Sequence, residues 1–135
     1  QLMEWFIEEF INPEGPYELI GYWANINEDS NITRGKVKIR VNGELREIEA
    51  DGNGPIDAFA KALDKLDING FRVTHDFHES SLGTGSDAPG IAFMPLVFDD
   101  EESVWWGVGT HNNTSVAAAR GIVAALNRRA KADAT

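Results

Sequence analysis

The sequence predicts an α+β fold of two βββα units related by pseudo-two-fold symmetry, with mostly antiparallel sheets that are each covered by a helix. Two observations support this prediction. Three strand-like segments followed by a helix-like segment occur twice along the 135 residues. The corners before the two helices, residues 51–55 and 107–114, are also loosely alike, since both combine glycine with asparagine. We therefore expect an internal duplication.

A short leading helix is expected before the first unit. Apolar residues recur at helical spacing in residues 1–11, and Pro13 ends that pattern. Aromatic and branched residues then predict a strand over residues 17–26. The polar residues 27–31 predict a turn, so the first unit opens with a strand that reverses direction.

An Asn42-Gly43 pair predicts a β-hairpin, because it lies between two runs that alternate polar with apolar residues. A strict two-residue turn would pair Val41 with Glu44. One extra bulge residue would instead pair Val41 with Leu45 and keep the apolar face continuous. We predict the bulge.

The first helix is expected after a glycine-rich corner at residues 51–55. Pro55 suits the first turn of a helix, where its missing N–H costs nothing. The apolar stripe that should face the core comprises Ala58, Phe59, Ala62, Leu63 and Leu66.

The second unit repeats this order. Its expected strands are residues 71–77, 91–98 and 104–108, which are separated by a Gly- and Ser-rich loop at 80–90 and an acidic turn at 99–102. The loop is either a lid or a loose tip. A polar corner at residues 109–115 leads into the last helix, whose C-terminal cations favour the helix dipole.

Two adjacent tryptophans, Trp105 and Trp106, lie in the last expected strand. Successive side chains of a strand point to opposite faces of the sheet. If one tryptophan enters the core, the other therefore meets a second layer or another subunit.

Composition excludes several classes of partner. The 22 acidic and 12 basic residues give a net charge of −10, which repels phosphate backbones and anionic lipid, so nucleic acid is an unexpected partner. The apolar runs are far shorter than the roughly 20 residues that span a bilayer, so we expect no membrane partner. The absence of cysteine fits a reducing compartment, and we expect a cytoplasmic location.

The polar residues give little support for catalysis or metal binding. A nucleophile would have to be serine or threonine beside one of three histidines, and no serine has a Gly-x-Ser-x-Gly setting. His75 and His78 would point to opposite faces of a strand, so they would not share a metal ion. His111 is expected to be solvated. We expect no active site, metal or cofactor in this chain.

The corner Gly52-Asn53-Gly54-Pro55 is the main candidate for ligand binding. Its two glycines allow a ligand to approach the backbone closely, and a helix N-terminus leaves N–H groups free for a carboxylate. A tight turn from a strand into a helix explains the same residues without a ligand. The residue pattern alone leaves both interpretations open.

Two segments carry a resemblance to a known family. One is the Gly52-Asn-Gly-Pro-Ile-Asp-Ala58 corner after a hairpin, and the other is Val104-Trp-Trp-Gly-Val-Gly109 before an alanine-rich helix. Together they resemble the C-terminal regulatory domain of 2-isopropylmalate synthase over about residues 35–131. Residues 1–15 look like the tail of the linker subdomain that precedes this domain in the family, which leaves residues 16–135 as the regulatory domain.

The resemblance implies a regulatory function. In that family, acetyl transfer from acetyl-CoA to 2-oxoisovalerate takes place in a separate (β/α)8 barrel, to which the divalent metal belongs. The regulatory domain forms a homodimer, binds L-leucine near the dimer interface and inhibits the barrel, so the expected ligand is leucine or a related branched-chain amino acid. Because Gln1 is not an initiator methionine, we expect a segment of a longer chain that includes the barrel.

The family's leucine pocket can be carried over position by position. It would comprise Gly52, Asn53, Gly54, Pro55, Ile56, Asp57, Thr74, Phe77, Ser81, Ala88 and Thr114. Thr74 and Thr114 replace apolar residues, Phe77 replaces a tyrosine, and Asp57 stands where a small residue is common. This more polar wall leaves two alternatives: a dimerisation module without a working ligand site, or the isoleucine-sensing domain of a citramalate synthase.

Overall fold

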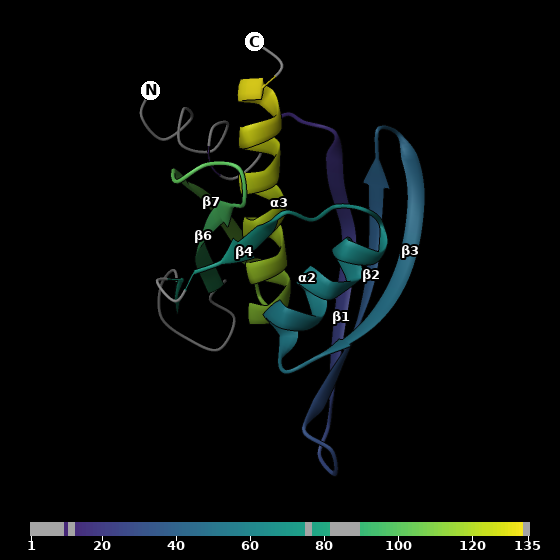
Figure 1. Ribbon diagram of the computed structural model, residues 1–135. Coiled ribbons are helices and arrows are strands. Elements are labelled where there is room, and N and C mark those ends of the chain that lie inside the picture. The colour runs from purple at the N-terminus through teal and green to yellow at the C-terminus, as the bar shows by residue number, and fades with distance from the viewer. Residues whose placement is uncertain (1–9, 11–12, 75–76, 82–89, 134–135) are drawn as a thin grey trace.

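The computed structural model describes residues 10, 13–74, 77–81 and 90–133 (Figure 1). The leading helix expected in residues 1–11 therefore falls mostly outside the described part. The elements are β1 (Tyr17–Asn27), β2 (Ile32–Val41), β3 (Glu44–Gly52), α2 (Pro55–Lys65), β4 (Phe71–Val73), β5 (His78–Ser81), β6 (Gly90–Phe98), β7 (Val104–His111) and α3 (Thr114–Asp133).

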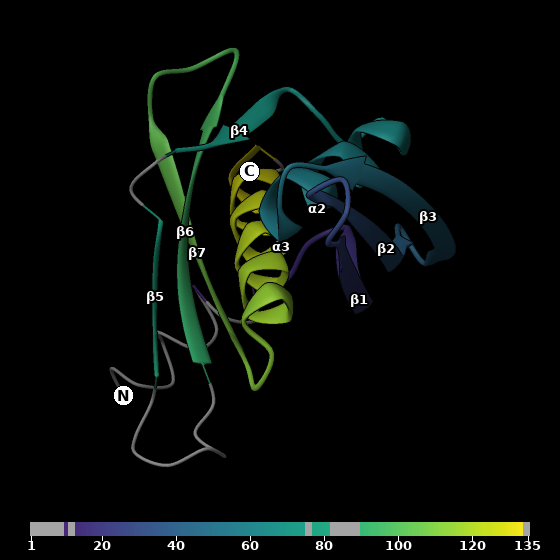
Figure 2. The same cartoon turned by 90° about the horizontal axis from the view of Figure 1, so that it is seen from below.

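Two antiparallel sheets form the outer layers. The first sheet has the order β1-β2-β3, and in the second sheet β4 and β5 share one edge of β6 while β7 pairs with its other edge. The helix α2 packs on the first sheet, whereas α3 packs on β6 and β7 and also contacts β1. Figures 1 and 2 accordingly show α3 between the two sheets. This arrangement confirms the predicted α+β fold with two βββα units.

The hairpin between β2 and β3 differs from the prediction. Val41 pairs with Glu44, so the turn contains only Asn42 and Gly43 and no bulge. Both turn residues have positive φ angles, 51° and 86°, which match the right-handed twist of the flanking strands. The cost is that Leu45 lies on the outer face of the sheet and is 47% exposed. Turn geometry thus outweighed the continuity of the apolar face.

The strand predicted over residues 71–77 is also wrong in part, because β4 ends at Val73 and β5 begins at His78. The Thr74 N–H donates a hydrogen bond of 3.1 Å to the Pro95 carbonyl. Pro95 has no N–H to return, so the ladder along this edge of β6 is interrupted there. The predicted loop at 80–90 overlaps β5 and β6 at its two ends, and its centre, residues 82–89, lies outside the described part.

The predicted corner at 109–115 is shorter than expected, since β7 continues to His111 and α3 begins at Thr114. Here α3 lies directly against β7. A Cβ atom added to Gly107 would lie 2.0 Å from the Gly121 carbonyl oxygen, and one added to Gly109 would lie 1.9 Å from the Ala117 oxygen. These glycines let the helix and strand backbones touch.

Asn127 joins the end of α3 to the start of β1. Its Oδ1 accepts a hydrogen bond of 3.0 Å from the Tyr17 N–H, and its Nδ2 donates one of 2.7 Å to the Tyr17 carbonyl. The side-chain amide therefore acts like a neighbouring strand for one residue of β1. With only 4% of its surface exposed, Asn127 holds the first unit against the second.

Two backbone carbonyls of β7 accept hydrogen bonds from arginines of α3. Arg128 donates to the Trp106 carbonyl at 2.6 Å, and Arg120 donates to the Thr110 carbonyl at 2.8 Å. Trp105 is half-buried, whereas Trp106 points the other way and is 37% exposed. The predicted opposite orientation of the two tryptophans is confirmed.

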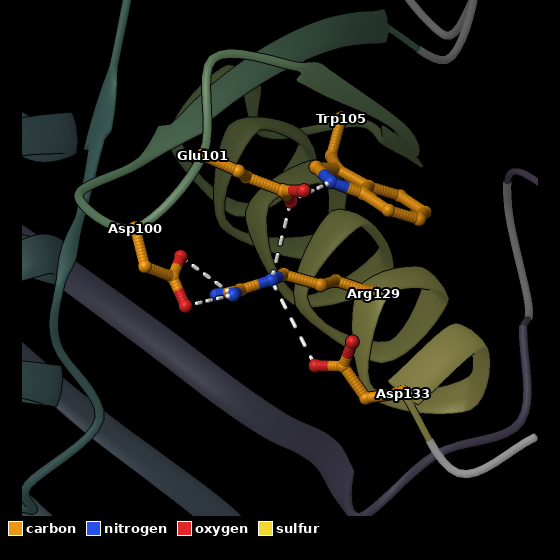
Figure 3. Close-up of polar contacts among 5 residues, drawn as sticks. All are labelled: Asp100, Glu101, Trp105, Arg129 and Asp133. Carbon is orange, nitrogen blue, oxygen red and sulfur yellow. Dashed lines mark hydrogen bonds and ion pairs between the residues drawn. The ribbon is translucent and has the colours of Figure 1, made fainter.

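A polar cluster fixes the β6–β7 turn to the C-terminal end of α3 (Figure 3). Arg129 Nη2 lies 2.6 Å from both carboxylate oxygens of Asp100, and Arg129 Nε lies 3.4 Å from Glu101 and 3.8 Å from Asp133. Trp105 Nε1 donates to Glu101 at 2.5 Å. The cluster thus positions Trp105 as well as the turn.

No helix in the described part is long and apolar enough to cross a membrane.

Candidate functional site: the corner before α2

The predicted corner lies where β3 ends at Gly52 and α2 begins at Pro55. Gly52 is required by packing, because a Cβ atom there would lie 2.5 Å from the Ala58 nitrogen. Gly54 is different. Its φ and ψ are both 176°, an extended conformation open to any residue, and no atom lies within 4 Å of a Cβ built there. The space beside Gly54 is therefore free for another molecule.

The first turn of α2 carries no side-chain cap. Its N-cap residue is Gly54, and the N–H groups of Ile56 and Asp57 have no acceptor within the helix. Tyr22 holds this first turn in place, because its hydroxyl donates a hydrogen bond of 2.5 Å to the Pro55 carbonyl. Burial raises the pKa of Tyr22 to about 12, so this hydroxyl remains a donor at physiological pH.

Asp57 brings a negative charge to the same corner. Its Oδ2 accepts a hydrogen bond of 2.8 Å from the Asn53 N–H and lies 2.9 Å from Lys61 Nζ. Partial burial disfavours the charge, but the Asn53 N–H and Lys61 outweigh burial and hold the pKa of Asp57 below its usual range. The corner therefore offers free N–H donors and an ionised carboxylate within one helical turn.

The start of α3, which contains Thr114, is closed by comparison. Asn113 Oδ1 accepts hydrogen bonds from the N–H groups of Ser115 at 2.9 Å and Val116 at 3.2 Å. These are the donors that an external carboxylate would need. Of the two repeated corners, only the first leaves its helix start open.

Of the remaining predicted residues, Thr74, Phe77 and Ser81 belong to other segments of the chain than this corner. Thr74 follows β4, Phe77 is 42% exposed before β5, and Ser81 ends β5 with its side chain outside the described part. Ala88 also lies outside the described residues. In Figure 2, β5 is at the edge of the second sheet, and its contacts are with β6 rather than with α2.

The two described histidines, His78 and His111, do not share a site. His111 Nδ1 accepts the Asn113 N–H at 2.9 Å, and the His78 ring lies 6.2 Å from that of Phe93. His75 is outside the described part. Within the described ranges, no group of three or more histidine, aspartate or glutamate side chains could hold a metal ion.

A cavity of about 640 Å³ was missed by sequence reasoning. It lies between the start of β1, the end of β7 and the middle of α3, with Glu18, Thr110 and Arg120 among its lining residues. These residues are far apart in the sequence. The internal repeat was the only signal that could have indicated it, and that signal does not identify side chains.

Two consecutive βββα units, the first with an open helix start, define a duplicated α+β domain. Residues 1–130 match the family described as LeuA allosteric (dimerisation) domain, and the chain belongs to that family. The resemblance inferred from the Gly52–Ala58 corner is thereby confirmed.

Three similar proteins carry the same name. The chain is 35% identical over 133 residues to a 2-isopropylmalate synthase of Clostridium acetobutylicum, covering 95% of this chain and 23% of that relative. It is 36% identical over 138 residues to a 2-isopropylmalate synthase of Parafrankia sp., covering 97% and 23%, respectively. A third relative, from Thermobifida fusca, is 33% identical over 129 residues, covering 95% of this chain and 22% of that relative. The chain thus spans less than a quarter of the length of these relatives.

Proposed function

We propose that this chain is the allosteric feedback-regulatory domain of a 2-isopropylmalate synthase. It pairs with a second copy, binds L-leucine and thereby inhibits acetyl transfer from acetyl-CoA to 2-oxoisovalerate in a catalytic barrel of the same enzyme. Family membership and the names of the relatives support this assignment. The structural observation that carries the ligand-binding part is the uncapped start of α2 beside Gly54.

The ligand carboxylate fits the first turn of α2. The N–H groups of Ile56 and Asp57 point out of the helix start, where the helix dipole favours an anion. Gly54 leaves the approach open because it has no side chain and no neighbour within 4 Å of its Cβ position. The equivalent position in the second unit is filled by the Asn113 side chain.

The ligand ammonium fits Asp57. The low pKa of this carboxylate keeps it charged, and the exposed Lys61 can move aside when a second cation approaches. Burial of a leucine side chain supplies only roughly 1.5 to 3 kcal/mol, whereas a micromolar affinity requires about 8 kcal/mol. The charged ends of the ligand must therefore supply most of the binding free energy.

The residues of the pocket wall would determine whether the site prefers leucine or isoleucine. Two residues carried over from the family to the pocket wall, Thr74 and Phe77, flank β4 and β5, whereas α2 packs mainly on β2 and β3. We propose that the second copy of the homodimer brings these residues to the corner. Binding near the dimer interface would then link ligand occupancy to the arrangement of the subunits.

A dimerisation module without a ligand site is the second candidate. It is favoured by the internal use of Asp57, which already bonds the Asn53 N–H and pairs with Lys61. The two candidates differ in whether an amino acid changes the environment of the corner. A cytoplasmic location fits both.

Titration of the ¹⁵N-labelled chain with leucine, isoleucine and valine separates these candidates. We expect saturable shifts of the amide resonances of Gly54, Ile56 and Asp57, which are lost in Gly54→Val and kept in the control Glu47→Val. Gly54→Val should fold normally, since the site is extended and open. If none of the three amino acids moves these resonances in a folded dimer, the domain is not a branched-chain amino acid sensor at this corner.

A further inference from the structure

We propose that the cavity between β1, β7 and α3 is a second binding site for a zwitterionic amino acid. It lies in the second repeat, beside the end of the third strand (β7) and the middle of the helix (α3). This inference rests on the proposed function, because the repeat transfers the ligand class from one unit to the other. One chain would then bind two ligand molecules.

The cavity has the size and position of a ligand site. Its volume of about 640 Å³ falls within the range of small-molecule sites, roughly 300 to 1,000 Å³. It lies where the two units meet, since α3 contacts both β7 and β1. A ligand here would touch both halves of the domain at once.

Opposite charges line its walls. Glu14 and Glu18 come from the approach to β1 and from β1 itself, and Arg120 comes from α3. Arg120 is held in place by its hydrogen bond of 2.8 Å to the Thr110 carbonyl, which leaves its other donors for a carboxylate. Glu18 also forms an ion pair with Arg40, whereas Glu14 is exposed. A molecule with both a carboxylate and an ammonium group matches this arrangement.

The rest of the lining is suited to an aliphatic side chain. Leu19, Val123 and Ala124 supply apolar surface, and Ala124 is buried within α3. Asn127 lies at one end, with its amide already bonded to the Tyr17 backbone, so it forms a fixed wall. Apolar walls with a few fixed polar groups are typical of small-molecule sites.

The internal repeat, together with the proposed function of the first unit, gives a second reason to expect a ligand here. In the proposed dimer, the corner site would combine the end of the third strand (β3) and the helix (α2) of one copy with residues near β4 and β5 of the other copy. The cavity combines the end of the third strand (β7) and the helix (α3) of the second unit with the first strand (β1) of the first. The helix start of α3 is closed by Asn113, so Arg120 takes its place as the carboxylate receptor.

Calorimetric titration of the chain with leucine tests the inference through its stoichiometry. We expect two molecules per wild-type chain, one in Gly54→Val, one in Ala124→Leu, which fills the cavity, and none in the double variant. Arg120→Gln should weaken the cavity site at least about tenfold, because a hydrogen bond to a charged group is lost. Because Arg120 is exposed, Arg120→Gln should fold even if Ala124→Leu does not.

The outcomes distinguish the two sites. If the wild-type chain binds one leucine, and this binding is lost in Gly54→Val but kept in Ala124→Leu and Arg120→Gln, the second site is refuted. The proposed function then still stands. One molecule that is kept in Gly54→Val but lost in Ala124→Leu supports the cavity site and refutes the corner. No heat with leucine, isoleucine or valine refutes both.

Discussion

The pairing of Asn127 with Tyr17 makes a direct prediction about how the two units are held together. Replacing Asn127 with alanine removes both hydrogen bonds, at 3.0 and 2.7 Å, and leaves the Tyr17 N–H and carbonyl without their partner. A typical hydrogen bond contributes about 0.5 to 1.5 kcal/mol net. Loss of two therefore costs about 1 to 3 kcal/mol.

Burial places the expected loss near the top of that range. Only 4% of Asn127 is exposed, and Gly15 packs so closely against it that a Cβ atom there would lie 2.2 Å from Asn127 Oδ1. The space left by the truncated side chain adds to the cost. We expect the free energy of unfolding to fall by about 3 kcal/mol.

Urea unfolding at pH 7, followed by tryptophan fluorescence, measures this change. Lys131→Ala, an exposed substitution on the same helix, is the control and should change stability by less than about 0.5 kcal/mol. A loss of less than about 1 kcal/mol in Asn127→Ala would refute the idea that this amide joins the two units.

Three further substitutions test separate parts of the structure. Tyr22→Phe should lower stability by about 1 kcal/mol at pH 8, because the Pro55 carbonyl loses a donor. The pKa of Tyr22 is about 12 in the folded state and near 10 when unfolded, so deprotonation favours the unfolded chain as the pH rises. Between pH 9 and 12 the free energy of unfolding should therefore fall by about 2 kcal/mol more in the wild type than in this variant. Equal losses, measured by urea unfolding, would exclude a buried hydroxyl. Gly109→Ala should lower the free energy of unfolding by about 3 kcal/mol or more, since its Cβ would lie 1.9 Å from the Ala117 oxygen. Gly54→Ala is the control and should be nearly neutral. Similar melting temperatures of the two variants would contradict the close packing of α3 on β7. Asn113→Ala should cost about 1 kcal/mol in thermal unfolding by removing the cap of α3, and no change would mean that water replaces the cap fully.

Local chemistry made much of the fold predictable from the sequence. The start of α2 followed from Pro55, and its buried face from the spacing of Ala58, Phe59, Ala62 and Leu63, all of which are buried. The β2–β3 hairpin followed from Asn42-Gly43, but its register did not. The positive φ angles of both turn residues fixed a two-residue turn, although Leu45 was left exposed.

Features that depend on contacts between distant segments were not predictable. The break between β4 and β5 depends on Pro95 of a neighbouring strand, which faces that edge without an N–H. The corner at Gly52 to Asp57 was found because its residues are contiguous. The cavity was missed because its walls come together only through tertiary contacts such as that between Tyr17 and Asn127, 110 residues apart.

A crystal structure of the domain grown with leucine tests the central claim most directly. It should show the leucine carboxylate within hydrogen-bond distance of the Ile56 and Asp57 N–H groups, and the ammonium group beside the Asp57 carboxylate. A folded dimer with leucine at saturating concentration and nothing bound at this corner would contradict the claim that the start of α2 is the sensing site.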